Sequence, residues 1–147
     1  MIPAGSRPGT SGRGRLAPIL VVDDEELVRE MVCAALRGQG YEVLEANNGK
    51  DALDVLAAAA TLPTLVLVDL TMRVMGGAEL VPILNHDYPG LRVIVTSGYS
   101  EEDVRKDLPP GVIAGFLQKP YTLSTLIEKV DVILNSGGPS EEVRKAA

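Results

Sequence analysis

The stretch Leu65-Val66-Leu67-Val68-Asp69-Leu70-Thr71-Met72 places four consecutive apolar residues directly before a carboxylate. A short apolar run of this kind, with polar Thr64 before it, predicts a β-strand that is buried on both faces. Asp69 then stands at the carboxyl end of that strand. In open α/β sheets, ligands bind at the edge that these ends form. Taken alone, Asp69 is equally consistent with a helix cap or a solvated loop acid, so its interpretation depends on its neighbours.

Four other segments predict strands, and each is followed by a helix-like pattern. The expected strands are Ile19–Val22, the more polar Tyr41–Ala46, Leu91–Thr96 and Gly111–Gln118. Apolar residues recur at helical spacing after each strand, although the pattern after Thr96 is short and poor in apolar residues. Five strand–helix alternations with short links predict a parallel sheet covered by helices on both faces. The polar second strand suits a sheet edge, which favours the strand order 2-1-3-4-5.

The length of 147 residues indicates one domain. Residues 1–16 are rich in Gly, Pro, Ser and Arg and predict a flexible leader or linker, residues 17–135 the folded domain, and residues 136–147 a flexible tail. A single cysteine, Cys33, excludes a disulfide framework and a cysteine-based zinc site. Cys33 is expected in the core, and the single histidine, His86, on a helix surface.

The formal net charge of −6 excludes some partners. Because Arg7, Arg13 and Arg15 are the only charged residues before Ala17, the acidic excess lies in the folded part. No basic face for nucleic acid is visible, so direct binding of nucleic acid is not expected. No segment approaches the roughly 18 apolar residues of a membrane span, and the first residues lack the apolar stretch of a signal peptide. A cytoplasmic location is therefore expected.

The distinctive polar residues all follow predicted strands: Asp23 and Asp24, Asp69, Thr96 and Lys119. The carboxyl ends of parallel strands share one edge, so these side chains are expected to converge. Two carboxylates 4 Å apart repel by roughly 4 kcal/mol at an effective dielectric constant of about 20, so the cluster needs a cation. Lys119 supplies one charge, and Mg²⁺ suits an open group of oxygen ligands. Such parts can bring a phosphoryl group to Asp69; solvated helix acids and a surface lysine are the alternatives.

Four motifs in this order resemble a response regulator receiver domain of two-component signalling: Val-Val-Asp23-Asp24-Glu, Val-Asp69-Leu-Thr-Met, Val-Thr96-Ser-Gly and Lys119-Pro120. The resemblance covers Pro18 to about Asn135. It implies a flavodoxin-like (βα)5 doubly wound sheet of order 2-1-3-4-5, as in the chemotaxis receiver that exemplifies this order.

The resemblance also implies roles for individual residues. Asp69 would accept a phosphoryl group from a histidine kinase or a phosphotransfer domain. The metal ligands for Mg²⁺ would be Asp23, Asp24, Asp69 and the backbone carbonyl of Thr71. Thr96 and Lys119 would bind the phosphoryl group, and Phe116 stands where receivers carry an aromatic switch residue; ordinary core packing is the alternative for Phe116.

Two residues near the expected site, Arg73 and Tyr99, are candidate modulators of that site. Receivers commonly have proline after the methionine of the Asp-x-x-Met segment, whereas this chain has Arg73. Proline fixes φ and stiffens a turn, while arginine does neither and adds a cation. Tyr99 is a second aromatic residue close to the site, with surface placement at the start of a helix as the alternative.

Three functions are compatible with these features. The leading hypothesis is a regulatory phosphoacceptor switch that is not itself an enzyme and that changes partner affinity through the helix-4/strand-5/helix-5 face, with a phosphorylation-dependent dimer as one form of output. The second is a pseudo-receiver that binds partners without phosphorylation. The least favoured is a Mg²⁺-dependent phosphatase, because such enzymes resemble one another in placing a second acid where Thr71 stands. The chain fits a stand-alone regulator or a part of a hybrid histidine kinase.

Overall fold

The structure is a computed structural model that describes residues 18–71, 75–108 and 111–135. Within these residues, strands and helices alternate as β1 Ile19–Val22, α1 Glu26–Gly38, β2 Val43–Ala46, α2 Gly49–Ala58, β3 Leu65–Asp69, α3 Gly77–Asp87, β4 Arg92–Ser97, α4 Glu101–Arg105, β5 Gly115–Gln118 and α5 Leu123–Asn135. The strands form one parallel sheet of order β2-β1-β3-β4-β5. The predicted fold and strand order are confirmed. No helix in the described ranges is long and apolar enough to cross a membrane.

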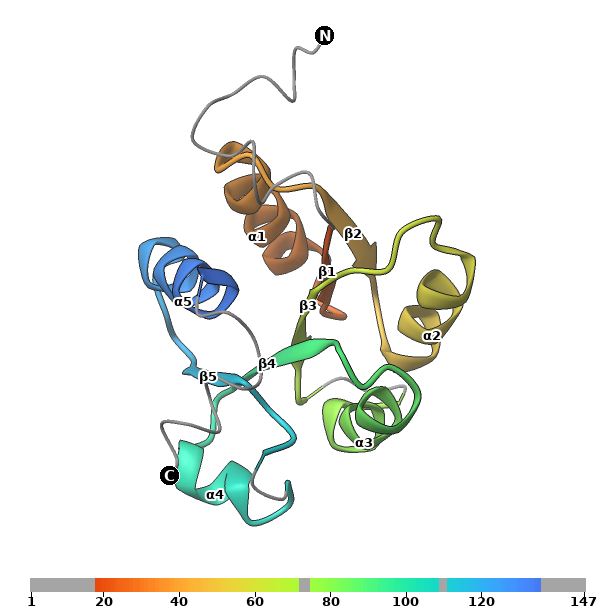
Figure 1. Cartoon of the computed structure of the whole chain (residues 1–147). Coiled ribbons are helices and arrows are strands. Elements are labelled where there is room, and N and C mark those ends of the chain that lie inside the picture. Colours follow the sequence, from red (N-terminus) through yellow and green to blue (C-terminus); the bar gives the residue numbers. More distant parts are fainter. Residues whose placement is uncertain (1–17, 72–74, 109–110, 136–147) are drawn as a thin grey trace, which may run out of the picture.

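Helices cover both faces of the sheet (Figure 1). Helices α1 and α5 lie side by side on one face, and α2 and α3 lie on the other. Successive residues of a strand point to opposite faces, so each central strand supplies both layers. Leu20 and Val22 of β1 belong to the apolar cluster under α2 and α3, whereas Ile19 and Val21 belong to the cluster under α1 and α5.

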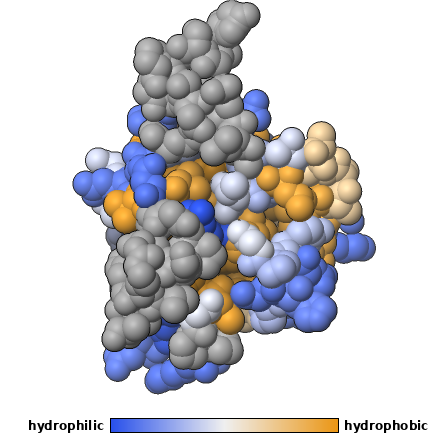
Figure 2. Space-filling view, viewed as in Figure 1, coloured by the Kyte–Doolittle hydropathy of each residue, from blue (hydrophilic) through white to orange (hydrophobic). Residues whose placement is uncertain are grey.

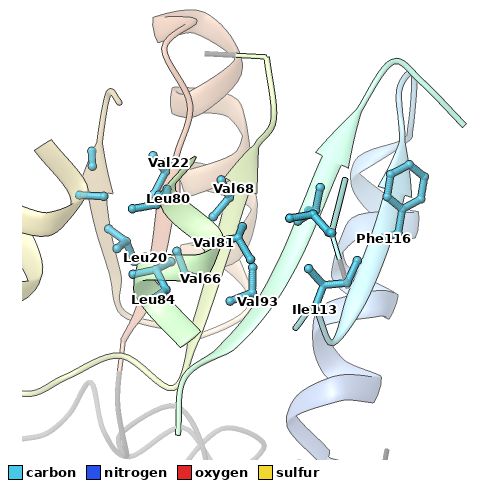
Figure 3. Packing of buried hydrophobic residues seen from close by; sticks show 14 of the residues in the cluster. Leu20, Val22, Val66, Val68, Leu80, Val81, Leu84, Val93, Ile113 and Phe116 are labelled. Atoms are coloured by element: carbon cyan, nitrogen blue, oxygen red, sulfur yellow. The ribbon is translucent and has the colours of Figure 1, made fainter. Parts of the chain in front are cut away.

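The cluster under α3 shows how the central strands are buried. Leu80, Val81 and Leu84 of α3 face the valines of β3 and β4 (Figure 3). Every residue of β1 and β3 is buried, as their apolar runs predicted. Cys33 is fully buried in the opposite cluster and His86 lies on the surface of α3, so both of those predictions are also confirmed.

The outer strands are shorter than their sequences suggested. Strand β5 begins at Gly115 rather than Gly111, because Gly111 has a φ of 88°, which turns the chain out of an extended path. Strand β2 begins at Val43 rather than Tyr41. The Tyr41 amide donates to the Leu36 carbonyl at the end of α1, so Tyr41 belongs to the connection and not to the sheet.

The Tyr41 side chain ties this connection to α5. Tyr41 is 5% exposed, and its hydroxyl donates a hydrogen bond to the Asp131 carboxylate on α5. Hydrogen bonds to charged groups contribute about 1.5–3 kcal/mol. Tyr41→Phe is therefore expected to lower the free energy of unfolding by about 1–2 kcal/mol, measured by urea denaturation. Tyr99→Phe, at an exposed ring, is the matched control and should leave stability unchanged; equal losses in both variants would contradict this assignment.

Helix α4 is the least embedded helix of the described chain. It has five residues, and of these only Val104 is buried. The Ser100 hydroxyl caps it by accepting a hydrogen bond from the Asp103 amide at 3.2 Å. Glu101, Glu102 and Asp103 are exposed, and the lower end of the molecule, where α4 lies, is largely hydrophilic (Figure 2). Few apolar contacts therefore hold α4 to the sheet.

Candidate functional site

The carboxyl ends of three strands meet at one edge of the sheet. Asp69, the last residue of β3, pairs in register with Thr96 of β4, and the Leu70 amide donates to the Thr96 carbonyl at 3.0 Å. The Lys119 amide donates to the Ser97 carbonyl at 2.7 Å, which brings the residue after β5 to the same edge. The parallel sheet therefore gathers residues that lie far apart in the sequence.

Three carboxylates converge at this edge. Asp23, Asp24 and Asp69 each place an oxygen so that all three atoms lie within 4.8 Å of one another. Asp23 is 5% exposed and Asp69 is 2% exposed, whereas Asp24 faces solvent. The cluster therefore has two buried acids and one solvent-facing acid, which leaves the site open on the Asp24 side.

Both carboxylate oxygens of Asp69 have partners. The Lys119 ammonium lies 3.1 Å from Oδ2. Oδ1 accepts two hydrogen bonds, from the Thr71 amide at 3.0 Å and from the Thr71 hydroxyl at 2.9 Å. The hydroxyl contact was not predicted from the sequence, although an Asp followed two residues later by Thr is a recognisable turn pattern. Asp69 is held in one orientation from two sides.

Burial and a neighbouring acid make Asp23 costly to ionise. Burial is the main reason that the pKa of Asp23 rises from 3.8 to about 6, and the negative charge of Asp69 adds to the rise. The Glu25 amide, which donates to Asp23 Oδ1 at 2.9 Å, and the Lys119 charge act in the opposite direction. Burial and the charges of Asp23 and Asp69 also raise the pKa of Tyr121 to about 12. The charge of Lys119 therefore does not fully offset the negative charge of this site.

These features fit a divalent cation. Carboxylates are hard oxygen ligands, and Mg²⁺ takes one or two of them together with water and phosphate oxygens. A carboxyl group whose pKa is raised by burial beside a second acid gains from such an ion, because the ion offsets both the desolvation and the repulsion. Asp23, Asp24 and Asp69 are the residues that would hold it, with the Thr71 carbonyl as the expected backbone ligand.

The remaining predicted site residues occupy three different environments. Thr96 is 2% exposed beside Asp69. Phe116 is 9% exposed and packs in the apolar cluster with Val104 of α4, and it lies on β5 beside Ile113 in Figure 3. Tyr99 is 66% exposed just before α4, and it lines the same cavity as Leu70 and Thr71. Arg73 lies outside the described residues.

Residues 19–131 match the family model of the response regulator receiver domain. The chain belongs to this receiver family. It is 35% identical over 118 residues to the sensor kinase CckA of Brucella abortus, covering 80% of this chain and 12% of that protein. It is 32% identical over 126 residues to the phosphate regulon transcriptional regulatory protein PhoB of Pseudomonas aeruginosa, covering 84% and 54%. This receiver domain therefore spans about half or less of the length of these curated relatives.

Solved structures of receiver proteins superimpose on this chain and support the same family. A CheY-like receiver domain protein from Methanospirillum hungatei superimposes with a TM-score of 0.74 at 25% identity, over 88% of this chain and 98% of that one. The response regulator protein TrrA from Thermotoga maritima, solved in complex with Mg²⁺-BeF, has a TM-score of 0.69 at 30% identity, over 78% and 96%. Receiver domains bind Mg²⁺ at an acidic pocket, and this receiver has a cluster of three acids, Asp23, Asp24 and Asp69, at the carboxyl edge of its sheet.

Gly77 lets α3 start directly against the backbone at the end of β3 in this receiver. A Cβ at Gly77 would lie 2.9 Å from Leu70 Cα and 3.2 Å from the Asp69 carbonyl oxygen. Both distances are shorter than ordinary contacts of a methyl group, so the loop backbone would have to move. The sequence alone does not indicate this close approach, because it depends on tertiary packing.

Gly77→Ala is expected to lower the free energy of unfolding by about 1–3 kcal/mol, the usual cost of overpacking. Thermal denaturation would measure the loss. Gly90→Ala is the matched control, because a Cβ at Gly90 meets nothing within 4 Å and this glycine lacks a positive φ. The control should be neutral or slightly stabilising. If Gly77→Ala behaves like Gly90→Ala, close packing at Asp69 is not what constrains Gly77.

Proposed function

We propose that this chain is a phosphoacceptor signalling switch in which Asp69 receives a phosphoryl group from a phosphohistidine donor in the presence of Mg²⁺. One observation carries the proposal. The Asp69 carboxylate is held 3.1 Å from the Lys119 ammonium, within a group of three acids whose oxygens all lie within 4.8 Å. The donor would be a histidine kinase or a phosphotransfer domain, because receiver domains pair with such proteins.

The proposed step forms one bond and breaks one bond. A carboxylate oxygen of Asp69 attacks phosphorus, the phosphorus–nitrogen bond of the donor breaks, and the nitrogen keeps the electron pair. Because the other ring nitrogen of the donor carries a proton, the products are an aspartyl phosphate and a neutral imidazole. When bound, Mg²⁺ supplies positive charge to the phosphoryl oxygens. Lys119 neutralises a further oxygen, and Thr71 orients Asp69 through its two hydrogen bonds.

The proposed output follows from the charge that phosphorylation adds. A phosphoryl group brings close to two negative charges, which attract Lys119 and the Thr96 hydroxyl. Thr96 lies on β4, which leads to α4, and Lys119 directly follows β5, which leads to α5, so the face formed by α4, β5 and α5 would change its affinity for partners. Phe116, which belongs to the same apolar cluster as Val104 of α4, would take part as the aromatic switch. A phosphorylation-dependent dimer is one form this output would take.

The remaining features of the proposal concern the whole protein. Residues 17–135 form the receiver unit, with residues 1–16 and 136–147 as flanking segments. The unit acts in the cytoplasm as a regulatory module and not as an enzyme. It works alone or as part of a hybrid histidine kinase, a class to which the sensor kinase relatives point.

Incubation with acetyl phosphate and Mg²⁺, followed by intact mass spectrometry, tests the proposal. The parent protein should gain the mass of one phosphoryl group, and Asp69→Asn should gain none because an amide cannot form the acyl phosphate. Beryllofluoride with Mg²⁺ should shift amide resonances around Asp69 in the parent only. A parent that behaves like Asp69→Asn in both experiments would refute the switch and leave a pseudo-receiver. Steady hydrolysis of a phosphomonoester would instead indicate a phosphatase.

A further inference from the structure

Two consecutive residues of the edge strand β2 are linked by hydrogen bonds to the backbone amide and the backbone carbonyl of Asp23. The Asp23 amide donates to the Ala46 carbonyl at 3.1 Å. The Asp23 carbonyl accepts a hydrogen bond from Arg29 Nη1 at 2.7 Å, and Arg29 Nε in turn donates to Glu45 Oε1 at 3.2 Å. Ala46 therefore binds Asp23 directly, and Glu45 is linked to Asp23 through Arg29. The turn between β1 and α1 is fastened to β2 on both sides of Asp23.

The position and burial of Arg29 favour this contact. It lies near the start of α1, and its side chain is only 15% exposed. Its guanidinium holds a carbonyl with one nitrogen and a carboxylate with another, a geometry that the planar fork of arginine permits and lysine does not. Because the guanidinium is charged, its bond to the Asp23 carbonyl is stronger than a neutral hydrogen bond. Arg29 binds the backbone of the turn, so the side chains of Asp23 and Asp24 are not used in this contact.

We infer that Arg29 is a positioning residue for the metal site. By bridging Glu45 and the Asp23 carbonyl, it fixes the turn that carries Asp23 and Asp24 and thereby sets the affinity for Mg²⁺. Mg²⁺ demands nearly ideal octahedral geometry, so ligands that are already in place bind it better than ligands that must be ordered. Removing a residue that orients metal ligands typically weakens metal binding by about 10- to 100-fold. This inference rests on the proposed function, because it assumes that the acids bind Mg²⁺.

Arg37 provides a matched control on the same helix. It contacts the same carboxylate, with Nη2 3.3 Å from Glu45 Oε2, and it also donates to the Val43 carbonyl at 3.3 Å. Its side chain is 51% exposed. Val43 begins β2, at the end of the strand away from Asp23. Arg37 therefore shares the charge, the helix and the acidic partner of Arg29, but its hydrogen bonds lead away from the metal turn.

The experiment titrates MgCl₂ into the full chain and follows amide resonances of the acidic turn by NMR. Arg29→Met should weaken Mg²⁺ binding by about tenfold, whereas Arg37→Met should stay within about twofold, since exposed ion pairs contribute little. Arg29→Lys keeps the charge but cannot hold both partners, so it should give an intermediate loss. Thermal midpoints in Mg²⁺-free buffer show how much each variant changes stability. In phosphorylation by acetyl phosphate, Arg29→Met should raise the Mg²⁺ concentration for half-maximal rate while leaving the rate at saturating Mg²⁺ close to that of the parent.

The outcomes separate this inference from the proposed function. A parent protein that binds no Mg²⁺ would overturn the proposed function, and this inference with it. A parent that binds Mg²⁺ normally, together with equal affinities in the Arg29 and Arg37 variants, would overturn the inference alone. If Arg29→Met does not fold, Arg29→Lys decides: a Mg²⁺ affinity equal to that of the parent would overturn the inference, and a loss larger than in Arg37→Met would support it.

Discussion

Asp23→Asn is expected to stabilise the metal-free protein at neutral pH and to remove most of the stabilisation that Mg²⁺ gives to the parent. Asp23 is 5% exposed, and burial raises the pKa of its carboxyl group to about 6, so its ionised form is disfavoured in the fold. Asparagine keeps an oxygen that can accept the hydrogen bond from the Glu25 amide. It removes the buried charge, and with it one of the three carboxylates that we propose hold Mg²⁺.

The pH dependence of this effect follows from the direction of the shift. The pKa of Asp23 is 3.8 in the unfolded chain and about 6 in the fold, so the folded protein binds more protons between these values. The contribution of Asp23 to stability is therefore fully present below the lower pKa and is lost as the pH rises through the upper one. A shift of this size corresponds to about 2–3 kcal/mol. The advantage of Asp23→Asn should be largest above the upper value and absent below the lower one.

Thermal denaturation of parent and variant across this pH window, with and without MgCl₂, measures both effects. Asp54→Asn, at an exposed acid of α2, is the matched control and should follow the parent at every pH. An Asp23→Asn protein that is less stable than the parent in Mg²⁺-free buffer at neutral pH would contradict the buried charge as the cause.

The sheet and its edge were predictable because they depend on simple patterns. Runs such as Leu65–Val68 are apolar on both faces, which only a covered parallel strand satisfies. Once the strands are parallel, their carboxyl ends must meet, so the gathering of Asp23, Asp69 and Lys119 follows from topology rather than from local structure. The order of the strands was predicted from the polarity of Tyr41–Ala46 and from the acids that follow the first and third strands, and as much from the resemblance to receiver domains.

Finer features of the site were not predictable because they depend on packing. The sequence does not indicate which of the adjacent acids Asp23 and Asp24 is buried. In the structure Asp23 is buried and Asp24 faces solvent. The difference arises because Asp23 continues the hydrogen-bonding path of β1 through Ala46, which turns its side chain into the site. The contacts of Arg29 with Glu45 and the Asp23 carbonyl likewise join residues whose proximity no spacing indicates.

Lys119→Met is expected to change metal binding and phosphorylation in opposite directions. The Lys119 ammonium lies 3.1 Å from Asp69 Oδ2 and competes with Mg²⁺ for the same group of acids. Unit charges 4 Å apart at an effective dielectric constant of about 20 interact by roughly 4 kcal/mol. Even when solvent reduces this value, losing the ammonium should strengthen Mg²⁺ binding by about tenfold. The rate of phosphorylation should fall by at least about 100-fold, because a charge that stabilises the transferring phosphoryl group is gone.

The opposite signs are what make this variant informative. A change that merely disordered the site would weaken Mg²⁺ binding and phosphorylation together. Titration with MgCl₂ by NMR and the initial rate with acetyl phosphate at saturating Mg²⁺ separate the two effects. Lys106→Met removes an exposed lysine whose ammonium lies 3.3 Å from Asp103 on α4, and it should change neither quantity. Tighter Mg²⁺ binding with an unchanged rate in Lys119→Met would mean that Lys119 only offsets the negative charge of the acids in the unphosphorylated protein. Weaker Mg²⁺ binding would mean that the lysine holds Asp69 in place for the metal.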